Sequence, residues 1–152
     1  MTSNIHVKMG EYKVCTDKKV LKSLGLGSCV AICLFDRENE IGSLGHVMLP
    51  SNRDKSSPKY ANNLLDSMIE SMKKEGYNRK KTVSKIFGGA SLFESSIAIG
   101  DQNIESVRKE LDKRNISIVA EDVGGKEGRS IWFHCWSGTV VVSKPMGRTK
   151  RF

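Results

Sequence analysis

The chain has 152 residues, with 25 Lys and Arg against 17 Asp and Glu and a formal net charge of +8. This length is enough for a hydrophobic core of its own, so we expect a single domain over residues 1–152. No apolar run reaches the roughly 20 residues that a membrane span needs, and the first residues lack a secretory-signal pattern, so we expect a cytoplasmic protein without membrane insertion.

The basic residues are scattered, without interleaved aromatic residues or a helix-turn-helix pattern. A solvated basic surface, which would also attract acidic partners, is therefore favoured over nucleic-acid binding. The four cysteines, at positions 15, 29, 33 and 135, are predicted to be free thiols, because a cytoplasmic chain is kept reduced. Their spacing completes no tetrahedral zinc set, and we expect no metal.

In chain order, residues 7–15 predict a first strand, and residues 20–24 lead into a glycine-punctuated loop that ends at Cys29. Apolar runs at 30–35 and 41–50 flank a charged turn, which predicts two antiparallel strands. Pairing about that turn brings Cys29 and His46 to one face of the sheet. A thiol beside an imidazole is the minimum set for a thiolate nucleophile.

The loop before Cys29 has a second chemical use. Gly25 and Gly27 allow a backbone shape that leaves the N–H groups around Ser28 and Cys29 facing a substrate carbonyl oxygen, as an oxyanion hole requires. Taken singly, each feature has a plainer interpretation: a glycine-rich strand entry, a buried inert thiol and a structural histidine. Cys33, inside the apolar run, keeps that plainer interpretation.

The second half of the chain predicts two helices and more strands. Ser57 is a candidate N-cap before Pro58, and apolar residues at helical spacing run from Ala61 to Met72 before Gly76 ends the helix. A strand over 82–87 precedes a glycine loop whose amides could approach a bound chain or form an ordinary turn. Asp101 is a candidate cap of the second helix.

The last part of the chain predicts a strand over 116–121 and a hairpin that pairs 131–136 with 139–143. Residues 145–152 are basic and are predicted to form a mobile tail. Many strands and two helices add up to an α+β domain.

Several consecutive-residue motifs run in order along the chain: Leu24 to Ala31, Gly45 to Pro50, Lys59-Tyr60-Ala61, Gly88 to Phe93, Ile99-Gly100 with Asn103, and Ala120 to Gly125. These motifs resemble the bacterial chemotaxis family CheD, whose members are chemoreceptor glutamine deamidases. The resemblance implies a β-sandwich core of mostly antiparallel strands with two main helices packed outside, similar to the catalytic domains of deamidating bacterial toxins.

The resemblance also assigns roles to residues. Cys29 matches the nucleophile and His46 the catalytic histidine, while Ser23 stands where the family has a catalytic threonine. Its hydroxyl could accept from the imidazole N–H, or a backbone carbonyl could orient His46 instead. The residues expected to bind substrate are Gly27, Ser28, Tyr60, Gly88, Gly89, Ala90 and Ser91.

The implied function is cysteine-dependent hydrolysis of glutamine side chains on the cytoplasmic helices of methyl-accepting chemoreceptors, without a cofactor. The implied second partner is the phosphatase CheC. Two alternatives stay open: a non-catalytic adaptor that binds receptor and CheC, and a thiol hydrolase that acts on small amides or esters.

Overall fold

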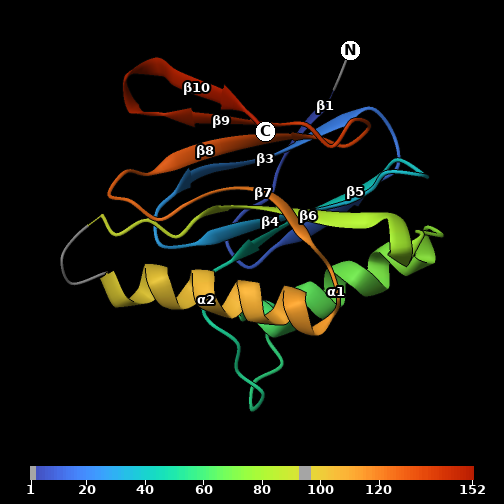
Figure 1. Cartoon of the computed structure of the whole chain (residues 1–152), viewed down its shortest axis with the longest axis horizontal. Helices are drawn as coiled ribbons and strands as arrows, with labels where there is room; N and C mark the ends of the chain where they lie inside the picture. Colours follow the sequence, from blue (N-terminus) through green and yellow to red (C-terminus); the bar gives the residue numbers. More distant parts are fainter. Residues whose placement is uncertain (1–2, 93–96) are drawn as a thin grey trace.

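A computed structural model of the chain describes residues 3–92 and 97–152, so Phe93 of the motif at 88–93 lies outside the described residues. Within these ranges the strands form two five-stranded sheets (Figure 1). The first sheet has the order β1 (Ser3–His6), β3 (Lys19–Leu26), β8 (Arg129–His134), β9 (Val140–Lys144) and β10 (Arg148–Arg151). The second has the order β2 (Tyr12–Cys15), β5 (Ile41–Val47), β4 (Val30–Asp36), β6 (Thr82–Gly88) and β7 (Ile118–Val123).

Helices α1 (Ala61–Lys74) and α2 (Ile97–Lys113) lie together on one side of the second sheet, and the first sheet lies on the other side (Figure 1). Short 3-10 turns cover Arg79–Lys81 and Pro145–Gly147. The β1–β3 and β6–β7 pairs are parallel, and the other paired strands among the described residues are antiparallel. This arrangement confirms an α+β fold with both helices outside the sheets.

Strand β4 shows how the sequence fills two cores. Its alternate side chains Ala31, Cys33 and Phe35 pack between the two sheets, in one cluster with Leu44 and Phe133. The intervening side chains, Val30, Ile32 and Leu34, pack under the helices. A strand covered on both faces needs apolar residues at every position, which is why residues 30–35 read as one continuous apolar run.

The predicted antiparallel pairing of the runs at 30–35 and 41–50 is confirmed, with the second strand ending at Val47. Strands β4 and β5 are antiparallel and pair from Val30 with Val47 to Asp36 with Ile41. The Asp36 carboxylate closes the turn by accepting hydrogen bonds from the backbone N–H groups of Glu38 and Asn39.

The first predicted strand is wrong in extent. Residues 7–15 do not form one strand, because Gly10, with φ of 78°, turns the chain between β1 and β2. Val7 donates its N–H to the carbonyl of Lys22 in the first sheet, while β2 pairs with β5 in the second. The turn therefore carries the chain from one sheet to the other.

Both predicted helix starts are also wrong. Helix α1 begins at Ala61, with Tyr60 rather than Ser57 at the N-cap position. Pro58 and Lys59 form a turn in which the Tyr60 N–H donates to the Ser57 carbonyl, and the Lys59 carbonyl accepts from the N–H groups of Met48 and Leu49, so the helix begins only after Tyr60. Helix α2 begins at Ile97, so Asp101 lies inside the helix and does not cap it.

The structure places the last residues in the first sheet, where the sequence predicted a mobile tail. Strand β10 pairs with β9, and the Phe152 backbone exchanges two hydrogen bonds with Val140. The Phe152 ring packs edge-on against Phe87 at 5.5 Å between centroids. An aromatic residue following a basic strand thus anchors that strand to the core.

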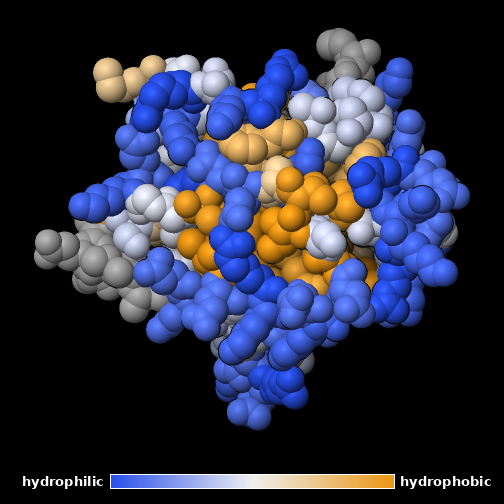
Figure 2. All heavy atoms as spheres, viewed as in Figure 1, coloured by the Kyte–Doolittle hydropathy of each residue, from blue (hydrophilic) through white to orange (hydrophobic). Residues whose placement is uncertain are grey.

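The surface on the side of α2 and β7 is mixed. Figure 2 shows hydrophobic atoms gathered near the middle of this face, within a rim of hydrophilic residues. Val119 of β7, the edge strand of the second sheet, is among the exposed apolar side chains. Neither α1 nor α2, as far as they are described, is long and apolar enough to cross a membrane.

Candidate active site

Cys29 lies one residue before β4, at the end of the loop that β3 feeds. Ala31 pairs directly with His46 of β5. Cys29, two residues before Ala31, packs against the same buried cluster as Ala31, as the alternation of side chains along an extended segment predicts. The structure thus brings the thiol and the imidazole to one face, between the two sheets.

The imidazole of His46 is almost fully buried and has a defined partner. Its Nδ1 lies 3.2 Å from the carbonyl oxygen of Val7. A carbonyl can only accept, so Nδ1 carries the proton in this hydrogen bond and Nε2 of the neutral ring keeps its lone pair. Burial lowers the pKa of His46, and the hydrogen bond to Val7 only partly offsets that effect. His46 is therefore a neutral base with one free nitrogen near neutral pH.

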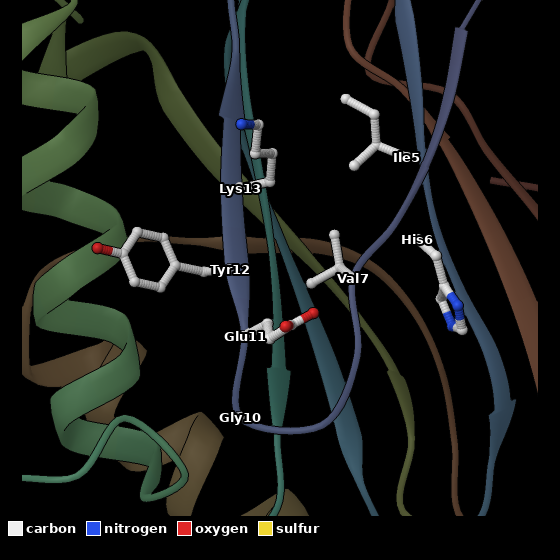
Figure 3. A pocket seen from close by; sticks show the side chains of 7 residues that line it. All are labelled: Ile5, His6, Val7, Gly10, Glu11, Tyr12 and Lys13. Carbon is white, nitrogen blue, oxygen red and sulfur yellow. The ribbon is translucent and has the colours of Figure 1, made fainter.

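The segment that joins β1 to β2 holds His46 in place. Besides the Val7 carbonyl on the ring, Gly10 donates its N–H to the His46 carbonyl at 2.9 Å, and the His46 N–H donates to the Glu11 carbonyl at 3.0 Å. The same segment lines a groove of about 490 Å³, in which the Val7 and Glu11 side chains face each other and His6 points away (Figure 3). The sequence allowed a backbone carbonyl to orient His46 but could not say which one, because a backbone carbonyl leaves no mark in the residue pattern.

Ser23 is fully buried in β3, in the sheet opposite His46. Its Oγ donates to the Val7 carbonyl at 2.8 Å. Among the hydrogen bonds of the described residues, the His46 ring is bonded to Val7 and not to Ser23, which corrects the expectation that the hydroxyl accepts from the imidazole. The two side chains share an acceptor, and this is the second of the two arrangements considered from the sequence.

The four cysteines are free thiols, as predicted, and they differ in exposure. Cys29 is partly exposed, whereas Cys15, Cys33 and Cys135 are buried. Burial raises the pKa of the Cys29 thiol, so it is protonated near neutral pH and reacts as a nucleophile only when a base removes its proton. Burial also raises the pKa of Cys33, far beyond the range in which it could ionise.

The predicted glycine loop at 88–91 runs beside the Cys29 loop, but its amides have a different use from the one expected. Gly89 donates its N–H to the Cys29 carbonyl and Ala90 to the Gly27 carbonyl, both at 2.8 Å. Ser91 donates to Gly125 at 2.9 Å. These groups are engaged within the protein and therefore support the Cys29 loop instead of facing a bound chain.

Gly88 lets the backbone of residues 88–89 come close to the Cys29 carbonyl. It has φ of 107°, and a Cβ atom there would collide with the carbonyl oxygen of Cys29. By contrast, the N–H groups of Ser28 and Cys29 donate to no acceptor among the hydrogen bonds of the described residues. These two donors are therefore available to hold an oxyanion.

Two further residues border the site. Tyr60 is half-buried at the start of α1, and it bridges to Leu49, three residues after His46. Asn103 of α2 is fully buried and donates from Nδ2 to the carbonyls of Ser28 and Met48. The sequence marked Asn103 only as part of a motif and gave it no role. Within residues 3–92 and 97–152, His, Cys, Asp and Glu side chains form no group of three that could hold a metal ion.

Comparison with known proteins agrees with the motifs. Residues 48–144 match the family model described as CheD chemotactic sensory transduction. A protein of Archaeoglobus fulgidus named probable chemoreceptor glutamine deamidase CheD is 42% identical over 97% of both chains. The chemoreceptor glutamine deamidase CheD of Thermotoga maritima is 40% identical over 93% of this chain and 92% of its own length. A Methanococcus maripaludis protein named probable chemoreceptor glutamine deamidase CheD is 40% identical over 91% of this chain and 93% of its own. The chain belongs to the CheD family.

Proposed function

We propose that this protein is a cysteine-dependent deamidase that converts glutamine side chains of methyl-accepting chemoreceptors to glutamate and releases ammonia, in the adaptation step of chemotaxis. The names of its relatives support the reaction. The observation that supports it best is that Cys29 packs against the cluster of Ala31, the residue that pairs with His46, and that Nδ1 of His46 is bonded to Val7.

The reaction begins with a proton transfer. Nε2 of His46 takes the proton of the Cys29 thiol, and the sulfur attacks the carboxamide carbon of the glutamine side chain. The carbonyl oxygen becomes an oxyanion that the N–H groups of Ser28 and Cys29 stabilise, and each such donor is typically worth about 100- to 1000-fold in rate. The imidazolium then protonates the leaving nitrogen, and ammonia departs from a thioester.

The second half-reaction restores the enzyme. His46 removes a proton from water, and the resulting hydroxide attacks the thioester carbon. The tetrahedral intermediate collapses, the carbon–sulfur bond breaks, and the thiolate regains the proton from His46, which leaves glutamate on the receptor. Each of these steps uses only the chain's own groups and water.

The electrostatics explain why both side chains are needed. An ordinary cysteine has a pKa of about 8.5, and burial of Cys29 raises its pKa, so very little thiolate forms unaided at neutral pH. His46 has a lowered pKa and is therefore unprotonated and able to accept. The pair is poised as thiol and neutral imidazole, and the ionic form arises only during attack.

The substrate glutamine is proposed to enter beside Gly27, Ser28 and Tyr60, while residues 88–91 support the Cys29 loop. Leu92 is 44% exposed and covers Gly27, where a Cβ atom would lie 3.0 Å from its Cδ1, so it gives this entrance an apolar rim. The net charge of +8 favours encounter with acidic surfaces. Action on cytoplasmic receptor helices, a second partner in CheC, and the likeness to toxin domains are part of the same proposal.

The direct test is mass spectrometry of a purified receptor cytoplasmic fragment after incubation with the protein. Wild type is expected to add about one dalton per converted glutamine and to release ammonia, and Cys29→Ala to do neither. Cys33→Ala is the matched control, because Cys33 is buried on the same face of β4 and has no proposed role. Unchanged deamidation by Cys29→Ala would remove Cys29 from the mechanism.

A non-catalytic adaptor is the second candidate, and one observation favours it. The Ser23 hydroxyl donates to the Val7 carbonyl, and among the described residues it does not accept from the His46 ring as expected, because Nδ1 of His46 is bonded to the same carbonyl. Iodoacetamide separates the two candidates. An adaptor predicts that alkylation of Cys29 is as slow in wild type as in His46→Ala, whereas a deamidase predicts a faster reaction in wild type near neutral pH.

A further inference from the structure

The β4–β5 ladder ends just short of Cys29. Its last pair on this side is Val30 with Val47. Beyond that pair the two segments part, because the N–H groups of Met48 and Leu49 donate to the carbonyl of Lys59 and not toward the Cys29 loop. The ladder alone therefore does not fix the distance between the thiol and the imidazole.

Asn103 spans the gap that the ladder leaves. Its Nδ2 lies 2.9 Å from the Ser28 carbonyl and 3.1 Å from the Met48 carbonyl. One carbonyl directly precedes Cys29, and the other is two residues after His46. A planar NH₂ group has two hydrogens in a fixed geometry, so a single side chain sets the separation of the two segments.

Asn103 is buried at a cost to stability, which indicates that its two hydrogen bonds have a role that an apolar side chain could not fill. The side chain is fully buried, and its Oδ1 has no hydrogen-bond partner among the described residues. An unpaired buried acceptor is destabilising, and an apolar side chain of the same shape would avoid it. What an apolar residue could not do is bond both carbonyls.

The local fold brings α2 close enough for this contact. Gly100 lies nearly one helical turn before Asn103, and a Cβ atom there would lie 2.7 Å from the Gly89 carbonyl oxygen and 2.8 Å from that of Ala90. Since Gly89 and Ala90 hold the Cys29 loop, the helix backbone rests directly on the support of that loop. The Cys29 loop is thus held on one side by the 89–90 amides and on another by Asn103.

We infer that Asn103 is a positioning residue that sets the separation of Cys29 from His46. The inference rests on the proposed function, because it concerns the geometry of that thiol and imidazole. A displacement of about 1 Å between reacting groups can cost roughly 100-fold in rate. Loss of the two Asn103 hydrogen bonds is therefore expected to lower kcat. It is not expected to act on substrate binding, because Asn103 has no exposed surface.

The test compares Asn103→Leu with Asn63→Leu. Asn63 is the matched control, since its Nδ2 also joins two backbone carbonyls, those of Lys55 and Ser57, in a loop without a proposed role. We expect Asn103→Leu to lower kcat for ammonia release by at least about ten-fold with KM nearly unchanged. Iodoacetamide alkylation of its Cys29, followed against pH, should lose the His46-dependent rate near pH 7 and rise only above the ordinary thiol pKa of about 8.5, because burial raises the pKa of Cys29.

Two results would overturn the inference. A folded Asn103→Leu protein whose alkylation profile matches wild type overturns the inference, and so does an equal loss in Asn63→Leu. If Asn103→Leu gives no cooperative melting transition, Asn103→Asp carries the same expectation, because it keeps the size and replaces the donor with an acceptor.

The inference and the proposed function can fail separately. If wild type releases no ammonia while its alkylation depends on His46 and on Asn103, the positioning role stands and the proposed substrate is wrong. If wild-type alkylation is no faster than that of His46→Ala, the pair does not operate and both are overturned.

Discussion

Ser23 and His46 donate to one and the same atom, the carbonyl oxygen of Val7, at 2.8 and 3.2 Å. They come from opposite sheets, Ser23 from β3 and His46 from β5, so this oxygen is a junction between the two layers. A carbonyl oxygen has two lone pairs and can accept both hydrogen bonds at once. We therefore expect any effect of Ser23 on the imidazole to pass through the backbone of Val7.

Ser23→Ala is expected to have a mild effect. The Val7 carbonyl keeps its bond to His46, so the loss should be about 1 kcal/mol of unfolding free energy and less than about ten-fold in kcat. Urea denaturation and ammonia release measure the two. Ser43→Ala is a suitable control, because the Ser43 hydroxyl is buried in β5 without a partner among the described residues and its removal should not destabilise. A fall in kcat as deep as that of His46→Ala would mean that Ser23 contacts the reacting groups directly.

The rate should decline on the acid side of the pH range. Only neutral His46 can accept the thiol proton, and burial lowers its pKa below the ordinary value of about 6.5. The pH at which the rate has fallen to half of its maximum should therefore lie below about 6.5. Ammonia release measured between pH 4.5 and 9, with circular dichroism to confirm folding, tests this. A midpoint above 6.5 would contradict the neutral, desolvated imidazole described here.

The same group links stability to pH. As the pH falls below about 6.5, the unfolded chain takes up a proton at His46 before the folded chain does, because the folded-state pKa is lower. The unfolding free energy should fall as the pH drops from about 6.5 to the folded-state pKa of His46. Below that pKa, His46 should contribute no further decrease. In His46→Gln this component of the pH dependence should be absent, which denaturant titrations of both proteins can show.

Much of the site was predictable because the signals were local. The charged turn before Ile41 and the apolar runs on both sides of it define the β4–β5 hairpin, and the period of two then assigns Cys29 and His46 to one face. The helix stop at Gly76, where φ is 81°, follows from the same kind of short-range chemistry.

The missed features depend on contacts between distant parts of the chain. Asn103 and Ser28 are 75 residues apart, and no periodicity connects them. The start of α1 was misplaced because Lys59 pairs with the segment after His46, which overrides the capping preference of Ser57. The Val7 carbonyl belongs to the backbone, so the residue type at position 7 could not indicate that it bonds to His46.

Gly100→Ala is expected to disturb the site from outside it. The added methyl group would lie 2.7 and 2.8 Å from two backbone carbonyl oxygens, which cannot move as a flexible side chain would. Helix α2 must shift, and this shift displaces Asn103 and the support of the Cys29 loop. We expect a loss of about 1–3 kcal/mol of stability and a larger proportional loss of kcat than of affinity. Gly76→Ala is a glycine replacement without such a collision: no atom lies within 4 Å of the added carbon, and although φ of +81° strains the backbone there, kcat should not change. Wild-type kcat in Gly100→Ala would show that α2 does not position the loop.

Phe152→Ala is expected to loosen β10 while leaving the chemistry intact. The ring of Phe152 packs edge-on against Phe87, and its backbone carbonyl accepts from Lys85 Nζ at 3.1 Å. Removing a half-buried aromatic ring should cost about 1–3 kcal/mol of unfolding free energy, measured by urea denaturation. Met146→Ala should change the unfolding free energy by less than about 0.5 kcal/mol, because Met146 is 98% exposed beside the same strand. The Cys29 alkylation rate should keep its dependence on His46 in both variants, since β10 pairs with β9 and neither strand carries a proposed site residue. If Phe152→Ala unfolds at the same urea concentration as wild type, the ring does not anchor β10, and the strand is held only by its backbone pairing with β9.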